Sequence, residues 1–301
     1  MRALRGNRIA MIFQDPGKAL NPGLSIRDQV AEVFLQHRSA DILEAAGVKG
    51  SGADPGAHLL RRQAGQRSRW PERVLLALPP LRGRRNRIEA AVDAMIVAAL
   101  AETQIPNPRK VMQRYPHELS GGMKQRVMIA QALACNPDLL IADEPTTALD
   151  VTVQARILEL FRELQQRRRT AVLYISHDLS LVRRVCDRVA VMYAGRIAEM
   201  GTTERIFADP LHPYTRGLLA AIPAAATERG HLAAIEGTVP ELVEPPPSCR
   251  FIGRCAHEAD VCSRLDPPFA PVAEDHATAC FIHHPPPPGY GEQPSNARRI
   301  R

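Results

Sequence analysis

The sequence predicts an α/β protein built around a parallel β-sheet, and three observations carry this prediction. Two short runs, residues 139–142 and 171–175, are continuously apolar, which is typical of strands buried on both faces. Between them, residues 151–168 carry apolar side chains at helical spacing. Short apolar strands that alternate with amphipathic helices form parallel sheets with helices packed on the faces.

The N-terminal part predicts one strand and two helices. Residues 9–13 form a short apolar run that ends at a Gln-Asp-Pro sequence, which indicates a strand leading into a loop. Residues 24–36 have helical spacing, and Ser25 can cap that helix. Residues 88–103 are also expected to be helical.

The stretch between these helices, residues 37–88, shows no clear periodicity, and Pro79-Pro80 is interpreted as a break. It contains a block that is rich in arginine and holds one acid, Glu72. The arginines stand at positions 61, 62, 67, 69, 73, 82, 84, 85 and 87. A basic patch can bind nucleic acid or anionic lipid. Trp70 is the one aromatic side chain there for stacking, so a solvated insertion is the preferred interpretation.

Regular alternation starts at Ser120, with a helix to Cys135, the strand 139–142, the helix 151–168 and the strand 171–175. A short helix is then expected at about 179–186. A β-hairpin comes next, with its turn at Ala194-Gly195. From about residue 223 the chain is rich in proline and loops, so residues 223–301 are expected to form a C-terminal extension.

Composition excludes several classes of protein. No run of about 18 apolar residues occurs, so the sequence predicts no membrane-spanning helix. The start, MRALRGNRIAMIF, has too short an apolar run for a secretory signal. From these two observations the chain is expected to be cytosolic and to reach a membrane only through a partner, and its net charge is +7.

Two motifs predict phosphoryl-transfer chemistry. Ser120-Gly121-Gly122 begins a helix, where glycine lets the backbone approach a phosphate and unpaired N–H groups can donate to it. Asp143 ends an apolar strand, where its carboxylate can reach Mg²⁺ through water. Glu144 is the next residue and can polarise an attacking water.

The stretch LSGGMKQRVMIAQALACNPDLLIADEPTTALD, residues 119–150, resembles the signature motif and Walker B of ABC-type ATPases. FQDPGKALNP, HDLSLVRRVCDRVAVMYAGRIAEMG and IFADPLHPYTRGLLAAIP make the chain similar to the ATP-binding subunits of oligopeptide and dipeptide importers. The resemblance covers residues 9–36 and about 112–282. It implies a P-loop NTPase core of the ABC ATPase type, with a helical subdomain and a cysteine-bearing C-terminal extension.

The resemblance also assigns roles to single residues. His177 matches the switch histidine that contacts the γ-phosphate, and Gln14 matches the Q-loop glutamine that ligates the metal. Asp150 matches the D-loop, and Gln125 belongs to the nucleotide-binding signature helix. In this family the signature motif addresses the ATP bound by the opposite subunit of a dimer.

Four cysteines gather in the tail, Cys249, Cys255, Cys262 and Cys280, with spacings of 5, 6 and 17 residues. The C-x2-C knuckles that zinc sites favour are missing, so an iron–sulfur cluster is preferred over zinc, with free thiols as a third option. Related importer ATPases carry a [4Fe–4S] cluster in this tail. A zinc site remains an alternative, because four histidines lie near these cysteines in the sequence: His257, His276, His283 and His284.

The sequence departs from the family in two ways. It contains no G-x-x-x-x-G-K-[ST], so the resemblance implies an N-terminally truncated ATPase without Walker A. A start codon placed too far downstream is the preferred explanation, ahead of a remnant gene or a subunit serving only the other half of a shared site. In addition, 106 positions separate Gln14 from Ser120, which indicates an insertion or a locally frameshifted stretch.

The sequence therefore predicts an ATP-hydrolysing subunit of a peptide-type importer. Residues 1–222 are the partial ATPase domain, with the helical subdomain and its arginine-rich insertion at about 24–135. The chain is expected at the cytoplasmic face of the membrane. Its expected partners are membrane-spanning permease subunits, a second ATPase subunit in a homo- or heterodimer and, indirectly, an extracytoplasmic solute-binding protein. No nucleic acid is expected. ATP and Mg²⁺ are the expected cofactors. The alternatives are a non-catalytic remnant and a soluble ABC ATPase acting on nucleic acid or ribosomes.

Overall fold

The computed structural model describes residues 4–47, 79–146, 151–168, 170–222, 235–238 and 247–288. The chain divides into a first unit, residues 1–177, and a second unit, residues 178–301. Asp150 and most of the arginine-rich block, residues 61–78, lie outside the described residues. No helix in the described part of the chain has the length and apolar character needed to cross a bilayer.

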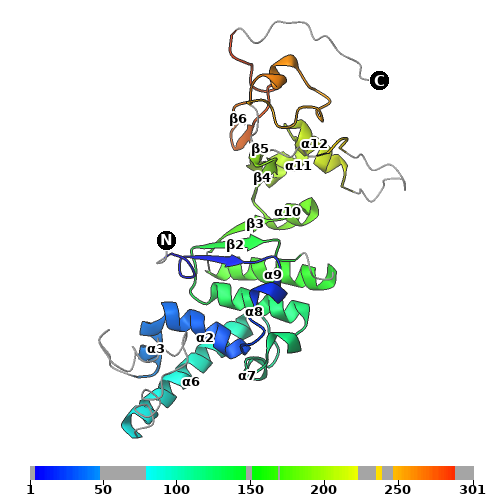
Figure 1. Ribbon diagram of the computed structural model, residues 1–301. Coiled ribbons are helices and arrows are strands. Elements are labelled where there is room, and N and C mark those ends of the chain that lie inside the picture. The colour runs from blue at the N-terminus through cyan, green and yellow to red at the C-terminus, as the bar shows by residue number, and fades with distance from the viewer. Residues whose placement is uncertain are drawn as a thin grey trace. The chain divides into compact units, whose positions relative to one another are not determined.

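The first unit contains the predicted parallel sheet (Figure 1). Its strands are β1 (Ile9–Ile12), β2 (Leu139–Asp143) and β3 (Ala171–Ile175), in the spatial order β1-β2-β3. Ile9 pairs with Leu139, which in turn pairs with Ala171. The three predicted strands are confirmed, and their carboxyl ends meet at one edge of the sheet.

Helices cover one face of this sheet. The two that neighbour the core strands in the chain are α8 (Gly121–Leu133) and α9 (Val151–Arg168). Their side chains form a core with the buried alternate positions of the strands, such as Ile12 and Leu140. On the other face, Met11, Leu173 and Ile175 are 40%, 52% and 45% exposed. The expectation of burial on both faces therefore holds for one face only in the described residues, because α8 and α9 contribute to the same core.

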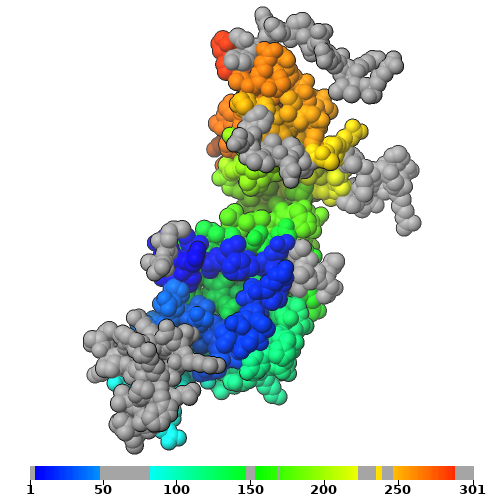
Figure 2. All heavy atoms as spheres, in the orientation of Figure 1, coloured from blue at the N-terminus to red at the C-terminus, as the bar shows by residue number. Residues whose placement is uncertain are grey.

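The remaining helices of the first unit lie between β1 and α8 in the chain. They are α1 (Pro16–Ala19), α2 (Ile26–His37), α3 (Ser39–Ala45), α6 (Pro79–Glu102), α7 (Pro108–Val111) and the 3-10 helix η1 (Pro116–Glu118). Ser25 caps α2, since its side chain accepts from Asp28 N at 3.2 Å, which confirms the predicted cap. The helix expected at 88–103 begins earlier, since α6 starts at Pro79, where proline lacks only an N–H that the first turn leaves unpaired; the residues before Pro79-Pro80 lie outside the described part. In Figure 2 the N-terminal residues, in blue, lie on the visible face of this unit.

The second unit contains an antiparallel sheet in the order β4-β5-β7-β6. Its strands are β4 (Arg188–Tyr193), β5 (Arg196–Thr202), β6 (Ala270–Ala273) and β7 (His276–Thr278). Ala194 and Gly195 join β4 to β5 with φ of 46° and 80°, the left-handed pair of a tight hairpin turn, so the predicted hairpin is confirmed.

Four short helices come before or between these strands in the sequence. They are α10 (Leu179–Val185), α11 (Thr203–Ala208), α12 (Pro213–Ala220) and the 3-10 helix η2 (Asp260–Ser263). The expected domain boundary at 222/223 falls inside the second unit. The reason is that β7, from the expected extension, pairs with β5, with Glu199 opposite Thr278. The proline-rich tail thus shares a sheet with the hairpin.

Candidate functional site

Glu144 lies where the carboxyl ends of β1, β2 and β3 meet, and it is held from two sides. Gln14 comes after β1, and its Nε2 donates to Glu144 Oε2 at 2.7 Å. His177 comes after β3, and its Nδ1 lies 2.9 Å from Glu144 Oε1. The structure therefore brings together the three residues expected to act in catalysis, although Gln14 and His177 are 130 and 33 positions away from Glu144 in sequence.

The backbone of Glu144 is strained. Its φ of 42° lies in the left-handed region, which is uncommon for a residue with a side chain and is found most often at functional sites. Its N–H donates to the carbonyl of Ile175 at 3.0 Å, so the end of β3 fixes this conformation. The conformation in turn fixes the Glu144 carboxylate beside His177.

Exposure differs between the members of this group. The Glu144 side chain is 22% exposed, whereas that of His177 is 70% exposed. Gln14 is exposed as well, and the adjacent Asp143 is half-buried at the end of β2. A half-buried carboxylate beside an exposed, titratable ring can polarise water that enters from solvent.

A second polar group supports the loop after Glu144, and the sequence did not suggest it. Thr146 is 4% exposed, and its Oγ1 accepts from Gln154 Nε2 at 3.2 Å. The same Oγ1 lies 3.3 Å from the Tyr174 hydroxyl on β3. Thr146 is thereby bonded to α9 and to β3. A polar residue inside an apolar strand, such as Tyr174 in AVLYI, is the signal that could have indicated it.

The signature residues occupy the start of α8. Ser120 caps the helix, since its Oγ accepts from Met123 N at 3.4 Å, and Gly121 is exposed. Gly122 packs on α9: a Cβ there would lie 2.8 Å from Val153 Cγ1. Gln125 is 1% exposed, so it faces the interior of the unit. Ser120 and Gly121 thus present this helix start to solvent, and Gly122 fixes it against α9.

In the second unit, the four tail cysteines line one cavity of about 320 Å³. All four are free thiols and are half-buried. Burial raises the pKa of the Cys249 thiol to about 11, and it also raises the pKa of Cys255 and of Cys280. In the described ranges, no three His, Cys, Asp or Glu side chains are grouped so that they could hold a single metal ion. The four thiols thus share the wall of one cavity.

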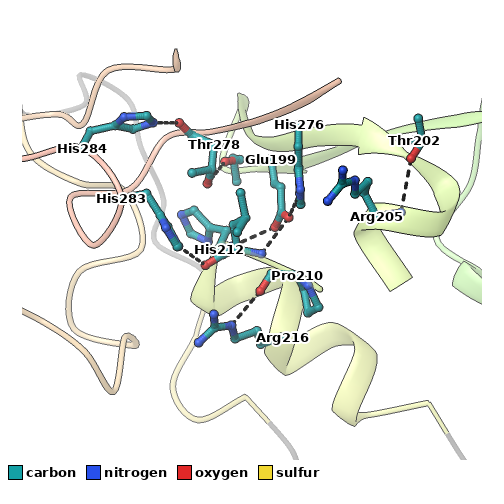
Figure 3. A network of polar contacts seen from close by, with 12 residues as sticks. Glu199, Thr202, Arg205, Pro210, His212, Arg216, His276, Thr278, His283 and His284 are labelled. Atoms are coloured by element: carbon teal, nitrogen blue, oxygen red, sulfur yellow. Dashed lines mark hydrogen bonds and ion pairs between the residues drawn. The ribbon is translucent and has the colours of Figure 1, made fainter. Parts of the chain in front are cut away.

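A buried carboxylate stands beside this cavity (Figure 3). Glu199, on β5, is fully buried and accepts from the backbone N–H groups of Leu211 and His212 at 2.8 and 2.9 Å. Its Oε1 also lies 2.8 Å from His276 Nε2, which donates to it. His212 itself lines the cavity, and burial lowers its pKa to about 4. The motif PLHPYTRGLL contained His212 but gave no sign of the carboxylate that it meets.

Comparison with known proteins agrees with both units. The model of the ABC transporter family matches residues 1–147, and that of the oligopeptide/dipeptide transporter C-terminal region matches residues 198–262. The chain is 40% identical over 282 residues to the dipeptide transport ATP-binding protein DppD of Bacillus subtilis (strain 168), covering 94% of this chain and 70% of that protein. It is 42% identical over 282 residues to the probable peptide ABC transporter ATP-binding protein y4tR of Sinorhizobium fredii, with 93% and 70% covered. The oligopeptide transport ATP-binding protein OppD of Bacillus subtilis is 40% identical over 286 residues, with 95% and 67% covered.

Proposed function

This chain belongs to the ATP-binding subunits of oligopeptide and dipeptide ABC transporters, and from that premise we propose how its residues divide the work of ATP hydrolysis. Glu144 polarises the attacking water, His177 contacts the γ-phosphate, and Gln14 and Asp143 serve the Mg²⁺ of the substrate, Mg·ATP. The observation that carries the proposal is the placement of Glu144 between Gln14 and His177, at 2.7 and 2.9 Å. General base catalysis requires the base to lie within hydrogen-bond reach of the reacting water, and Gln14 and His177 hold the Glu144 carboxylate in one place for that contact.

The same geometry defines a resting arrangement. Each carboxylate oxygen of Glu144 already has a partner, Gln14 on Oε2 and His177 on Oε1. A carboxylate oxygen can accept two hydrogen bonds, so each oxygen of Glu144 keeps a second site to which a water molecule can donate. The ring of His177 is 70% exposed and can turn toward a phosphate that enters from solvent. In this proposal nucleotide binding draws His177 from Glu144 Oε1 to the γ-phosphate, while Gln14 stays on Oε2.

The signature residues act on a second nucleotide in this proposal. The exposed start of α8, at Ser120 and Gly121, offers unpaired backbone N–H groups to the ATP held by a second ATPase subunit. The sequence contains no G-x-x-x-x-G-K-[ST], so the residues available here are the base, the switch histidine, the Q-loop and the signature. Closure of the dimer would move the permease subunits at the cytoplasmic face of the membrane, and the solute-binding protein would deliver a peptide to them.

The proposal is tested by a chromosomal Glu144→Gln substitution in the host, with uptake of a labelled dipeptide and a labelled pentapeptide as the measurement. We expect uptake to be lost while the amount of membrane-bound subunit is unchanged. Glu163→Gln is the matched control, since Glu163 is an acid on α9 that pairs with Arg167 and lies outside the site. Unchanged peptide uptake in Glu144→Gln would favour a non-catalytic remnant or an ATPase with another task.

We also propose that the cysteine cavity holds a [4Fe–4S] cluster. Four thiols line one cavity, and four Cys thiolates are the usual ligand set of such a cluster. A cluster spreads its iron atoms, so each thiolate binds a different one. Anaerobic purification, with subsequent iron, sulfide and zinc analysis, tests this, with Cys280→Ser as the ligand variant and Cys135→Ser as the control in the first unit. Zinc without iron, or no metal in the wild-type chain, would contradict the proposal.

A further inference from the structure

Glu199 connects two segments of the chain that lead to the cysteine cavity, the one before α12 and the strand β7. It is fully buried, and within Figure 3 it lies between the segment before α12 and the strand β7. From the first it accepts the N–H groups of Leu211 and His212, and from the second it accepts His276 Nε2. A buried carboxylate with three donors is costly to disturb, because each donor that loses it is left unpaired.

Both segments lead directly to the cavity. His212 forms part of its wall, as does the adjacent Pro213. His276 begins β7, which carries the chain to Cys280, and Ala279 N donates to Ala198 O at 2.8 Å beside Glu199. Gly201, opposite His276 in the sheet, makes this packing feasible, because a Cβ there would lie 3.0 Å from His276 Cδ2.

Two of the other cysteines are held differently. Cys249 N donates to Cys262 O at 2.9 Å, so these two are joined by their own backbone. The neighbouring Phe251 is buried against Tyr193 and Tyr214, with ring centroids 5.2 and 5.5 Å apart. The Glu199 carboxylate instead bonds the segment of His212 and the strand β7. Cys280 reaches the cavity from the end of β7.

We propose that Glu199 is a positioning residue of the cysteine cavity: it fixes the His212 wall and the strand β7, which leads to Cys280, to β5, and so sets the place of Cys280 in the cavity that Cys249 and Cys262 also line. The four thiols are thereby assembled before a metal group binds. This role deepens the proposed cluster site, but it concerns the metal-free chain and is tested without metal.

The test is alkylation of the reduced, metal-free, full-length chain, with the rate at each cysteine measured by peptide mass spectrometry. In Glu199→Gln we expect Cys280 to react about tenfold faster, as loss of a hydrogen bond to a charged group implies. Cys249 and Cys262 should keep their rates, and so should Cys186, which lies on the same unit after α10. His276→Leu removes this one donor only and should also accelerate Cys280 selectively.

Thr202→Ala is the matched control. It removes the cap of α11, where Thr202 Oγ1 accepts from Arg205 N at 3.3 Å, and it alters the same strand without touching the cavity. It should leave the rate of Cys280 unchanged. An equal acceleration of Cys186, Cys249 and Cys280 in both Glu199→Gln and His276→Leu would mean general loosening and would overturn the proposal, as would no acceleration at all. Absence of iron from the wild-type chain would contradict the proposal of a cluster, but it would not affect the proposed role of Glu199.

Discussion

Substitution of Gly122 by alanine tests whether the signature helix is fixed by its contact with α9. The added Cβ would lie 2.8 Å from Val153 Cγ1 and 3.8 Å from Val153 Cγ2. Real Cβ atoms essentially never come within 3.0 Å of a heavy atom to which they are not covalently linked. Valine in a helix has one strongly preferred χ1 rotamer, so Val153 cannot turn away at low cost. We therefore expect the start of α8 to be pushed away from α9.

The magnitude results from two opposing effects. Overpacking of this kind costs about 1–3 kcal/mol. Alanine is favoured over glycine inside a helix by up to about 1 kcal/mol. The net destabilisation of Gly122→Ala should therefore be up to about 2 kcal/mol. Val153→Ala makes room for the new methyl group, so the double variant should be more stable than the sum of the two single changes predicts, by about 1–3 kcal/mol.

Hydrogen exchange of the α8 and α9 peptides is the suitable assay, because it reports local free energies without requiring the whole chain to unfold in one step. Gly83→Ala is the matched control: Gly83 lies within α6, and a Cβ there meets nothing within 4 Å. It should stabilise α6 by about 0.5–1 kcal/mol. If Gly122→Ala also increased protection, or if Val153→Ala gave no rescue, the reasoning from the contact would be refuted.

Three further predictions concern other contacts. Tyr174→Phe removes the hydroxyl that meets Thr146 Oγ1 and should cost about 0.5–1.5 kcal/mol, measured as reduced exchange protection of β3. Arg168→Ala removes a pair with Glu102 and a donor at 2.6 Å to the last turn of α8, and should destabilise the first unit by about 1–3 kcal/mol in urea unfolding; no loss would show that the pair is only a surface contact. Burial holds the pKa of His212 at about 4, below its ordinary 6.5, so the unfolded chain takes up a proton first as the pH falls. The stability of the second unit should therefore be full above about pH 6.5 and fall by up to about 3 kcal/mol toward pH 4, and thermal unfolding of His212→Asn should lose most of this dependence.

Most of the fold could be predicted because its signals are local. Continuous apolar runs indicated β1, β2 and β3, and helical spacing indicated α2, α8 and α9. The hairpin turn was readable because Gly195 adopts a positive φ at no steric cost. The start of α6 was not readable, since the same Pro79-Pro80 pair can end one segment or begin a helix, and the choice depends on whether the residues after the pair find a core to pack against.

The candidate site was predicted in part. Glu144 was indicated by its place after a strand, Gln14 and His177 were indicated by the resemblance to the family, and the structure adds that the three touch. Thr146, Gln154 and Tyr174 were missed, because their spacing in the sequence carries no pattern. Gln125 was expected at the nucleotide, and its helix position places it in the interior instead. Asp150 stays a prediction.

The sequence by itself determined the family, the order of strands and helices, and the residue types that can perform the chemistry, because these depend on short motifs and on the period of the apolar pattern. Only the tertiary structure decided which of those residues meet. Pairing of β1, β2 and β3 side by side brings Gln14 and His177 onto the two oxygens of Glu144. Pairing of β7 with β5 places His276 on Glu199 and directs Cys280 into the cavity of the other three cysteines. The physical reason is that such contacts join residues far apart in the chain, and their positions depend on strand register and buried packing, which no local pattern specifies.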